Sequence, residues 1–462
     1  MSFLGIENIP SSNLAAIDDS GCQITFGELQ SNSIRFKELL IPRSLVFLFC
    51  ENTIDAFRLY VACIEANVVP LLLSPQTDTV FIENLIETYS PNYILGPTKV
   101  CQNINGENIY QVGEYEAKRI HSNLHLLADD LALLLPTSGS TGSPKLVRHS
   151  YTNLSSSAKN VASFFNLDAS DRPITFLPMY YAMGLSIINS HLIKGACILL
   201  VNSSLTDANF WKFLKESAPT SITGVPYSFE ILKKLGFFRM NIPSLKLLSQ
   251  GGGKLSEVLY DDCIAFCEKH GLHFIPTYGQ TEGSARMAFL SPEMVKLKKR
   301  SIGKSIPGGS LSVLSADGSE SFDGEETGEM IYRGENVTLG YAHHLNDLSR
   351  NNDNNGVLAT GDIVYRDADG FYFIVGRKSR FLKLYGIRVS LDEIEKMVVD
   401  HFDIECICFG NDQQMKVWVT NEKYISSVRD LIVNRTSLFH QAIAVEFVAE
   451  IPRNETGKVI YN

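Results

Sequence analysis

The stretch "LLLPTSGSTGSPKLVRHS" (133–150) joins an apolar run to a loop rich in glycine and hydroxyl residues. The apolar residues 131–135 predict a buried strand, which Pro136 ends. In the loop, glycines let backbone N–H groups turn toward a ligand, hydroxyls donate further hydrogen bonds, and Lys145 adds a positive charge. Such a loop is typical of polyphosphate binding, although it lacks the spacing of the Walker motif. A flexible Ser/Gly linker is the alternative interpretation, but linkers rarely place one lysine so close after a strand.

Outward from this loop, short apolar strands alternate with amphipathic helical stretches. The run "SLVFLFC" (44–50) is followed by a helical stretch at 53–68 and then by "VPLLL" (69–73). This alternation predicts an α/β fold with doubly wound, mostly parallel sheets. From about residue 301 the pattern changes to short strands with Asp-Gly turns, which predicts a small β-barrel-like part or a distorted sheet. The tail that follows has helix, strand and helix signals and predicts a small α+β domain.

The composition argues against several classes of protein. The chain has 462 residues and a net charge of −10, and without a long basic tract it does not suggest a nucleic-acid partner. Nine cysteines in so long a chain do not indicate a disulfide framework, and the pairs Cys263/Cys267 and Cys406/Cys408 lack a second ligand pair at zinc spacing. We interpret those pairs as buried thiols, which favours a reducing cytoplasm. The first residues lack a basic n-region and the apolar runs are too short to span a bilayer, so we expect neither a targeting segment nor a membrane span.

Three further segments contain residues suited to chemistry. The segment "SQGGGKLS" (249–256) places three glycines after a predicted strand, where a ligand or another backbone can approach closely. The segment "PTYGQTEGSARM" (276–287) contains Glu282, and Mg²⁺ prefers one or two carboxylates together with phosphate oxygens. The segment "IPRNETGKVIYN" (451–462) places Lys458 beside a glycine turn, where an ordinary surface lysine would also fit.

In their order along the chain, these segments resemble the adenylate-forming superfamily, which includes acyl- and aryl-CoA synthetases, peptide-synthetase adenylation domains and firefly luciferase. The matching motifs are "TSGSTGSPK", "YGQTEG", "TGD", "GRKSRFLKLYGIRVSLDEIE" and "PRNETGKV", between residues 137 and 459. Alone, the Thr-Gly-Asp motif is typical of a simple turn. The resemblance implies ATP- and Mg²⁺-dependent activation of a small carboxylic acid to an acyl-adenylate, with release of pyrophosphate. It further implies transfer of the acyl group to a thiol, either of CoA or of the phosphopantetheine of an acyl or peptidyl carrier protein.

The resemblance also assigns roles to individual residues. Thr281 would contact the α-phosphate, Glu282 would bind Mg²⁺, and Lys458 would reach the α-phosphate and carboxylate oxygens during adenylation. The residues expected at the nucleotide are Thr137, Ser138, Gly139, Ser140, Thr141, Gly142, Lys145, Gly251, Gly252, Gly253, Tyr278, Gly279, Gln280, Asp362 and Arg377. The residues expected at the acyl group are Tyr181, Met183, Gly184, Gly224 and Val225.

A mobile C-terminal domain is part of what the resemblance implies. It gives an N-terminal AMP-binding domain at 1–378 and a small C-terminal domain at 379–462, with the hinge at Ser379. After rotation, the stretch near Lys383 would replace the C-terminal lysine in the site. The basic stretch 377–388 is either a solvated charged face or a docking surface for the phosphates of CoA or for an acidic carrier protein.

The match has three departures from the family pattern. Leu146 stands where glycine is usual, Tyr151 where histidine is usual, and Ser379 where the hinge usually has Asp or Lys. None of them removes a charged catalytic group, so we expect an active enzyme; a non-catalytic, nucleotide-binding relative with a scaffold or regulatory role is the alternative. No acidic residue lies between Asp171 and Asp207, which disfavours an α-amino acid as substrate. A short or aromatic acid fits the apolar candidate residues better than a long acyl chain.

Overall fold

The computed structural model describes residues 4–136, 145–378, 380–384, 387–411, 413–436, 438–453 and 459–460. The chain forms two compact units. The first comprises Met1–Lys299, Ser305–Ser310 and Arg333–Leu358, and the second comprises Arg300–Lys304, Leu311–Tyr332 and Ala359–Asn462. These two units are defined by which residues pack together. The boundary expected after residue 378 is instead the hinge of a mobile domain, and it stays a prediction.

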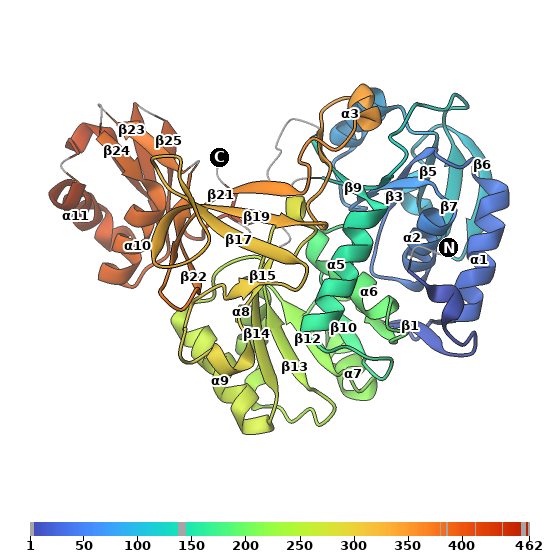
Figure 1. Ribbon diagram of the computed structural model, residues 1–462, viewed down its shortest axis with the longest axis horizontal. Coiled ribbons are helices and arrows are strands. Elements are labelled where there is room, and N and C mark those ends of the chain that lie inside the picture. Colours follow the sequence, from blue (N-terminus) through green and yellow to red (C-terminus); the bar gives the residue numbers. More distant parts are fainter. Residues whose placement is uncertain are drawn as a thin grey trace. The chain divides into compact units, whose positions relative to one another are not determined.

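Two large sheets form the first unit (Figure 1). One has the order β20-β9-β8-β4-β3-β5-β7-β6, in which β3 lies parallel to β4 and β5, and β4 lies parallel to β8. Its strands are β3 (Leu45–Phe49), β4 (Val69–Leu73), β5 (Tyr93–Pro97), β6 (Glu107–Val112), β7 (Tyr115–Arg119), β8 (Leu131–Pro136), β9 (Leu146–Ser150) and β20 (Gly340–Ala342). The parallel centre confirms the doubly wound α/β fold, and the edges of the sheet are antiparallel.

The other sheet of this unit contains the order β15-β14-β13-β12-β10-β11-β1-β2, with parallel pairs from β14 to β1. Its strands are β1 (Leu14–Asp18), β2 (Gln23–Thr25), β10 (Pro173–Thr175), β11 (Ile198–Leu200), β12 (Ser221–Gly224), β13 (Leu247–Gln250), β14 (His273–Tyr278) and β15 (Ala288–Phe289). The short strand β16 (Lys304–Ser305) lies at the change from one unit to the other.

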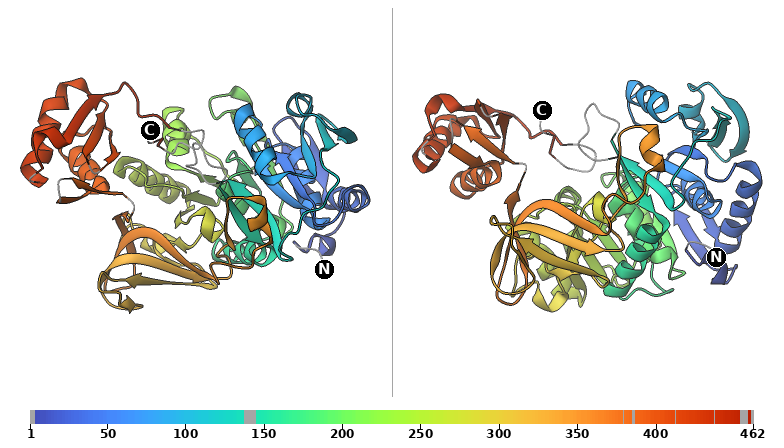
Figure 2. Two further views of the ribbon diagram at one scale, coloured as in Figure 1. Left: turned by 90° about the horizontal axis from the view of Figure 1, so that it is seen from above. Right: turned by 45° about the horizontal axis from the view of Figure 1, so that its top comes forward.

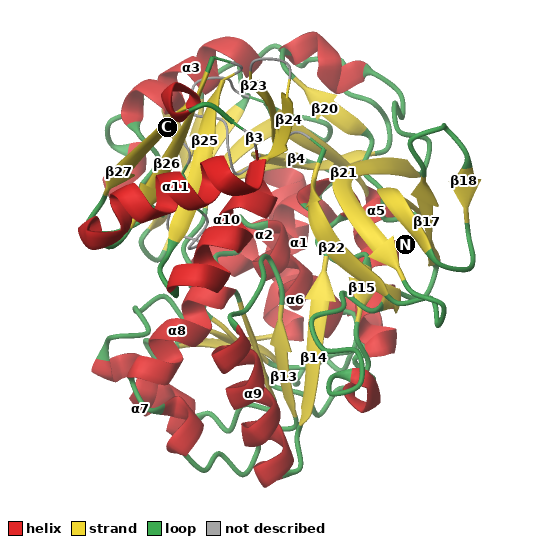
Figure 3. Ribbon diagram, turned by 90° about the vertical axis from the view of Figure 1, so that its left-hand side faces the viewer, coloured by secondary structure: helices red, strands yellow, loops and turns green. Residues whose placement is uncertain are grey.

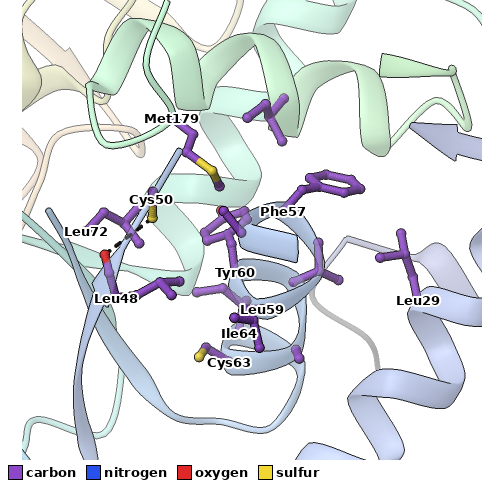
Figure 4. Close-up of a cluster of buried hydrophobic side chains, with 14 of the residues drawn as sticks. Leu29, Leu48, Cys50, Phe57, Leu59, Tyr60, Cys63, Ile64, Leu72 and Met179 are labelled. Atoms are coloured by element: carbon purple, nitrogen blue, oxygen red, sulfur yellow. Dashed lines mark hydrogen bonds between the residues drawn. The ribbon is translucent and has the colours of Figure 1, made fainter. Parts of the chain in front are cut away.

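Helices pack on both sheets, and the buried apolar residues of the unit form separate hydrophobic cores. They are α1 (Phe26–Leu39), α2 (Ile54–Glu65), α3 (Thr79–Tyr89), α4 (Thr98–Cys101), α5 (Tyr151–Phe164), α6 (Ala182–Leu192), α7 (Ala208–Glu216), α8 (Pro226–Lys234) and α9 (Glu257–His270). Helix α5 packs on β8 and β9, helix α6 packs on β10 and β11, and the two helices pack on each other. Around α2, the side chains of Leu48, Phe57, Tyr60 and Met179 belong to one of these cores, which contains residues of both sheets (Figure 4). The packing joins the two sheets into one body.

Local sequence explains where several helices begin. Ser150 ends β9 and caps α5, because its hydroxyl accepts from the backbone N–H of Asn153 while the Asn153 side chain accepts from the backbone of Ser150. Thr25 and Glu28 form the same arrangement at the start of α1. Strand β9 therefore passes into α5 without a loop. The helix thus holds the end of β9, which is the strand that follows the predicted phosphate loop.

The second unit contains a small antiparallel sheet and a separate α+β part (Figure 2). The sheet has the order β18-β17-β19-β21-β22 and runs from one edge strand to the other without closing into a barrel. Its strands are β17 (Gly309–Leu314), β18 (Glu320–Ser321), β19 (Glu326–Gly334), β21 (Val357–Arg366) and β22 (Tyr372–Arg377). It is the small β part that the sequence indicates after residue 301.

The C-terminal part has a core of its own, which includes Leu382, Val398, Val417 and Val445. Its elements are β23 (Phe381–Leu384), β24 (Ile387–Ser390), α10 (Leu391–Phe402), β25 (Cys406–Asn411), β26 (Gln414–Val419), α11 (Ile425–Thr436) and β27 (Ile443–Phe447). Helices α10 and α11 pack on the sheet β25-β26-β27 (Figure 3). This arrangement confirms the small α+β domain.

Single 3₁₀ turns complete the described elements: η1 (Ile6–Asn8), η2 (Phe237–Arg239), η3 (Thr281–Gly283), η4 (Pro292–Met294), η5 (Leu345–Ser349), η6 (Glu422–Tyr424) and η7 (His440–Ala442). All nine cysteines are free thiols, and both pairs noted in the sequence are buried. Within the described ranges, no helix is both long and apolar enough to cross a membrane.

Candidate active site

The predicted residues of the first unit gather at one edge of the sheet that contains β12, β13 and β14. These strands are parallel, with Gly224 beside Gln250 and Gln250 beside Pro276, so their carboxyl ends lie together. Tyr278 ends β14 at the same edge. Ligands of open α/β sheets bind outside the carboxyl ends of the strands, so the topology places the predicted glycines where a ligand is expected.

The three glycines after β13 are shaped by close neighbours. A Cβ on Gly251 would lie 2.5 Å from Cε of Met183 and 2.8 Å from Oγ1 of Thr277, so a larger residue would displace one of them. The backbone N–H of Gly251 donates to the Gly224 carbonyl over 3.1 Å. The structure thus brings Met183, Gly224 and Gly251, all predicted from sequence, into contact.

The start of α6 forms the neighbouring wall. A Cβ on Gly184 would lie 2.2 Å from the Pro178 carbonyl oxygen, which explains the glycine at this position. The backbone N–H of Tyr181 donates to the same carbonyl over 3.0 Å, and its ring lies 4.7 Å from that of Tyr180, centroid to centroid. Tyr181 and Gly184 are therefore held at one tight turn into the helix.

Glu282 lies in a constrained turn directly after β14. A Cβ on Gly279 would lie 1.8 Å from the Ala285 carbonyl oxygen, so only glycine fits there. Ser284 and Ala285 have φ angles of 51° and 81°, a conformation that non-glycine residues rarely adopt. Such strain persists where the surroundings determine the backbone, which is common at functional sites.

A loop ahead of β20 holds this turn in place. The Asn336 side chain donates to the Gly283 carbonyl over 2.7 Å, and the Ser284 hydroxyl donates to the Asn336 carbonyl, also over 2.7 Å. The backbone N–H of Thr338 donates to the Glu282 carbonyl over 3.0 Å. The Glu282 backbone is therefore fixed on two sides.

Tyr341 connects Glu282 to Lys145. Its hydroxyl donates to Oε1 of Glu282 over 2.6 Å, and Nζ of Lys145 lies 3.4 Å from the centroid of its ring. Burial and the Glu282 charge raise the pKa of Tyr341, so the phenol stays protonated and donates. Strand β20 lies antiparallel to β9, with Tyr341 beside Val147. Tyr341 thus contacts both Lys145, which follows the predicted phosphate loop, and Glu282, the predicted metal ligand.

His149 is a neutral side chain inside this region. Burial lowers its pKa to about 3, and its Nδ1 lies 3.3 Å from Oγ of Ser284. Because the Ser284 hydroxyl proton goes to Asn336, Nδ1 carries the imidazole proton and Nε2 is an acceptor. Among the described residues, this Nε2 has no hydrogen-bond partner. His149 and Ser284 line a cavity of about 20 Å³ together with residues of β8, α5 and α6.

Arg286 follows the Glu282 turn and is completely buried. Its Nη1 donates to Oγ of Ser186 over 2.7 Å, and its guanidinium lies 5.1 Å from the centroid of the Phe165 ring. In the described part of the chain, its Nε and Nη2 find no hydrogen-bond acceptor. Burial lowers its pKa to about 9, which still leaves the group cationic at pH 7.

In the second unit, Asp362 and Arg377, both expected at the nucleotide, form an ion pair. They face each other across β21 and β22, and Nε of Arg377 lies 2.9 Å from Oδ1 of Asp362. Asp362 is buried, and the backbone N–H of Arg377 donates to Oδ2 of Asp392 over 2.8 Å. The pair is thus ordered within its own sheet.

Several predicted residues lie outside the described residues. They are Thr137, Ser138, Gly139, Ser140, Thr141, Gly142, Ser379 and Lys458. Lys383 lies on β23, where its backbone pairs with that of Arg388. The predictions for all these positions remain predictions.

Sequence reasoning missed Tyr341, His149 and Arg286. Tyr341 is far from the motif that contains Glu282, and only strand pairing joins them. Arg286 lies within a quoted motif, and a charged residue between Ala285 and Met287, in an otherwise apolar run, is a signal that could have been followed.

Comparison with known proteins fits this geometry. Residues 9–342 match the family model described as AMP-binding enzyme. Oxalate–CoA ligase from Arabidopsis thaliana is 29% identical over 313 residues, which cover 66% of this chain and only 58% of that protein. The 2-succinylbenzoate–CoA ligase from Bacillus licheniformis is 28% identical over 349 residues, 73% of this chain and 70% of that one.

A solved structure shares the whole fold. The o-succinylbenzoate CoA synthetase from Bacillus subtilis, in complex with the acyl-adenylate intermediate OSB-AMP, has a TM-score of 0.78 and 22% identity, with 99% of this chain and 96% of that one covered. The same synthetase in complex with ATP and magnesium ion has a TM-score of 0.76 and 21% identity, covering 99% of this chain and 98% of that one. Since the family model spans more than half of the chain and agrees with the motifs, the chain belongs to the family of AMP-binding enzymes.

Proposed function

We propose that the chain is an AMP-forming acid–thiol ligase. The carboxylate of a small acid attacks the α-phosphorus of ATP, the bond to the bridging oxygen breaks, and pyrophosphate leaves with that oxygen. A thiol then gives up its proton, and its sulfur attacks the acyl carbon of the adenylate; the bond from that carbon to the phosphate oxygen breaks, and AMP leaves with that oxygen. In the first step two anions approach each other, so nearby positive charge is essential.

The arrangement of Glu282, Tyr341 and Lys145 is the observation that supports this proposal most. The Glu282 carboxylate is fixed through its backbone and by the Tyr341 hydroxyl, and the cation of Lys145 stands on the same ring. Fixed polar groups of opposite sign suit stabilisation of a phosphoryl-transfer transition state. A protein that only binds nucleotide would not need this arrangement, which argues against the non-catalytic alternative.

Magnesium fits the donor set of the site. No group of three or more His, Cys, Asp or Glu side chains in the described ranges forms a ready-made cage. Mg²⁺ is commonly held by one or two carboxylates together with substrate phosphates, and Glu282 supplies such a carboxylate. When bound, the ion would neutralise phosphate charge, while Lys458 from the C-terminal part would approach the reacting oxygens.

The names of the relatives favour CoA as the thiol. Both curated relatives are CoA ligases, and the solved neighbour is a CoA synthetase with an adenylate complex. A carrier protein remains the rival acceptor, and the basic stretch 377–388 suits the phosphates of either. Free thiols at all nine cysteines agree with a cytoplasmic setting.

ATP–pyrophosphate exchange with a panel of aromatic, short aliphatic, hydroxy, amino and dicarboxylic acids tests the first half-reaction. We expect exchange that depends on one class of acid and on Mg²⁺. Lys458→Ala should lower exchange by roughly 10²–10³-fold while ATP binding persists, because the lysine acts on the developing charge. Glu282→Gln should raise the Mg²⁺ concentration needed.

Lys159→Ala is a control on the surface of α5, away from the motifs. It should retain the exchange of the wild type. ATP binding without exchange for any acid in the panel would contradict the proposal and favour the non-catalytic alternative. Exchange that is unchanged in Lys458→Ala would remove that lysine from its role.

A further inference from the structure

The turn that carries Glu282 has a conformation that its own residues disfavour. Ser284 and Ala285, here called the left-handed pair, have φ angles of 51° and 81°. Glycine adopts such angles without strain, but neither position is glycine. Within the turn, the Ser284 N–H donates to the Thr281 carbonyl over 3.1 Å. Because strained residues persist only where their surroundings determine the backbone, groups outside the turn have to hold the pair.

The side chain of Asn336 supplies bonds on both sides of the left-handed pair. Its amide donates one proton to the Gly283 carbonyl over 2.7 Å and the other to the Arg286 carbonyl over 3.2 Å. Its backbone carbonyl accepts from the Ser284 hydroxyl over 2.7 Å. Asn336 is completely buried, where hydrogen bonds are stronger than in water. One residue thus bridges the carbonyls immediately before and after the strained pair.

Asn336 is itself held from helix α5. Asn153, in the first turn of that helix, donates its two amide protons to the carbonyls of Glu335 and Val337, both over 2.7 Å. The same side chain completes the cap at the start of α5, and it is buried. Two buried amides in series therefore connect α5 to the turn.

The position of the left-handed pair affects the whole turn. The Ala285 carbonyl oxygen would lie 1.8 Å from a Cβ on Gly279, so the end of the turn packs directly against its beginning. A shift of the pair would therefore move the backbone that carries Thr281 and Glu282. Catalysis of phosphoryl transfer depends on positioning, and a displacement of about 1 Å can cost roughly 100-fold in rate.

We propose that Asn336 is a positioning residue of the adenylation step: by bonding the carbonyls on either side of the left-handed pair, it fixes where the turn presents Thr281 and Glu282. This inference rests on the proposed ligase function. In this role Asn336 acts through the backbone of the turn and needs no contact with substrate. Its removal should therefore change the Mg²⁺ dependence of the enzyme and the order of the turn, beyond any effect on stability.

ATP–pyrophosphate exchange as a function of Mg²⁺ tests the proposal in Asn336→Ala. A turn that is no longer held presents the Glu282 carboxylate less precisely. The Mg²⁺ concentration for half-maximal exchange should therefore rise about tenfold, and kcat should fall by roughly 10–100-fold. The KM for the acid should stay near that of the wild type, because the residues expected at the acyl group keep their own contacts.

Two measurements follow the turn without turnover. Backbone amides of the peptide 279–287 should exchange hydrogen faster in Asn336→Ala than in the wild type. Calorimetry of ATP binding in MgCl₂ and in EDTA gives the gain in ATP affinity that Mg²⁺ brings. This gain should be about tenfold smaller in the variant.

Asn92→Ala is the matched control. Asn92 is also buried and donates to two backbone carbonyls, that of His121 over 3.3 Å and that of Asn123 over 2.7 Å. The segment that it holds contains no residue expected at the nucleotide or the acyl group. Both alanine variants lose comparable bonds and should melt at lower temperature. Asn92→Ala should nevertheless keep the Mg²⁺ requirement of the wild type and its hydrogen exchange in the peptide 279–287.

Two further variants test how Asn336 acts and do not depend on the folding of Asn336→Ala alone. Glycine at position 285 adopts the left-handed conformation without strain, so Ala285→Gly should recover part of the Mg²⁺ affinity that Asn336→Ala loses. Ser284→Ala removes only the hydroxyl bond to Asn336 and should raise the Mg²⁺ requirement by about threefold. A Mg²⁺ requirement equal to that of the wild type in Ser284→Ala and in Asn336→Ala would overturn the inference.

The outcomes distinguish the inference from the function on which it rests. A lower melting temperature in Asn336→Ala, with the Mg²⁺ requirement and the peptide exchange of the wild type, would make Asn336 structural only and leave the ligase standing. Absence of pyrophosphate exchange from the wild type with every acid, while ATP still binds, would refute the ligase and the inference with it.

Discussion

Two completely buried arginines of the first unit have opposite surroundings. Arg148 on β9 donates through Nη1 to the Arg350 carbonyl over 2.7 Å, and through Nη2 to the Leu339 carbonyl over 3.0 Å and to Oδ2 of Asp353 over 2.7 Å. Only its Nε lacks a partner in the described part of the chain. Arg286 has one hydrogen bond, from Nη1, and both Nε and Nη2 lack a partner there.

The number of acceptors around each buried guanidinium predicts how much each arginine contributes to stability. Arg148 joins β9 to the segment 339–353, which is far away in sequence, and so it holds β20 and its neighbours against the sheet. Among the described residues Arg286 donates to one acceptor only, so we expect an apolar residue in its place to cost the folded chain no stability.

Replacement of Arg148 should have the largest effect on stability. Arg148→Met removes the donors to four acceptors, the carbonyls of Leu339, Arg350 and Asn351 and the Asp353 carboxylate, which should lower the free energy of unfolding by about 3 kcal/mol. Urea unfolding of Arg148→Met and Arg286→Met at pH 7.5 measures the contrast. We expect a large loss for the first and no loss for the second.

Arg148→Lys is the matched control, since it keeps the charge but loses the fork. Its free energy of unfolding should lie between those of the wild type and Arg148→Met, because a lysine cannot reach all four acceptors at once. Equal stability of the two methionine variants would mean that partner number does not distinguish the arginines, and the comparison would fail.

Acidic pH should lower the stability of the protein through two histidines that are buried in the same unit. Burial lowers the pKa of His149 to about 3 and that of His191 to about 4, both below the ordinary value near 6.5. At pH values between the lowered pKa and the ordinary pKa, the histidine binds a proton in the unfolded chain but not in the folded chain. Each histidine therefore leaves stability intact above about pH 6.5 and lowers it by about 1.4 kcal/mol per pH unit as the pH falls further.

The difference between His149→Asn and the wild type isolates one of these contributions. Urea unfolding at pH 7.5, 6.0 and 5.0 should show a smaller loss in acid for the variant, by about 2 kcal/mol at pH 5.0. Carboxylates titrate in both proteins and cancel in the difference. Parallel curves for the two proteins would show that His149 accepts a proton in the folded state.

The order of strands and helices was predictable because hydrophobic periodicity reports local burial. The runs at 44–50 and 69–73 became β3 and β4, with the intervening stretch as α2. The antiparallel edges were not predictable in the same way. The segment at β20 joins β9 from almost two hundred residues away, and nothing in its three residues indicates that partner.

The site was predictable only where motifs are contiguous. The close packing of the turn at Glu282 is determined within its own motif, because the close approaches of Gly279 and Gly283 are to Ala285 and Met287, whereas the glycines after β13 approach residues of other segments, such as Met183 and Val225. The Tyr341–Glu282 bond and the isolation of Arg286 depend on contacts between distant segments. Whether a charged residue finds a partner is a property of packing, and the sequence alone does not contain it.

Tyr341 extends the comparison to a polar group that is bonded inside the site, and its removal should have the smallest effect. Tyr341→Phe keeps the ring beneath Lys145 but removes the hydroxyl that donates to Glu282. One hydrogen bond to a charged group that keeps its backbone supports should be worth about 1 kcal/mol, so the exchange rate should fall by about fivefold to tenfold.

The matched variant Tyr341→Leu removes the ring as well and should lower the rate further, because Lys145 then loses its cation–π contact. Titrations of Mg²⁺ and ATP at saturating acid measure both variants. A larger Mg²⁺ requirement in Tyr341→Phe, with an unchanged melting temperature, would place the hydroxyl as a positioning group for Glu282, whereas a rate equal to that of the wild type would show that the backbone bonds alone hold the carboxylate.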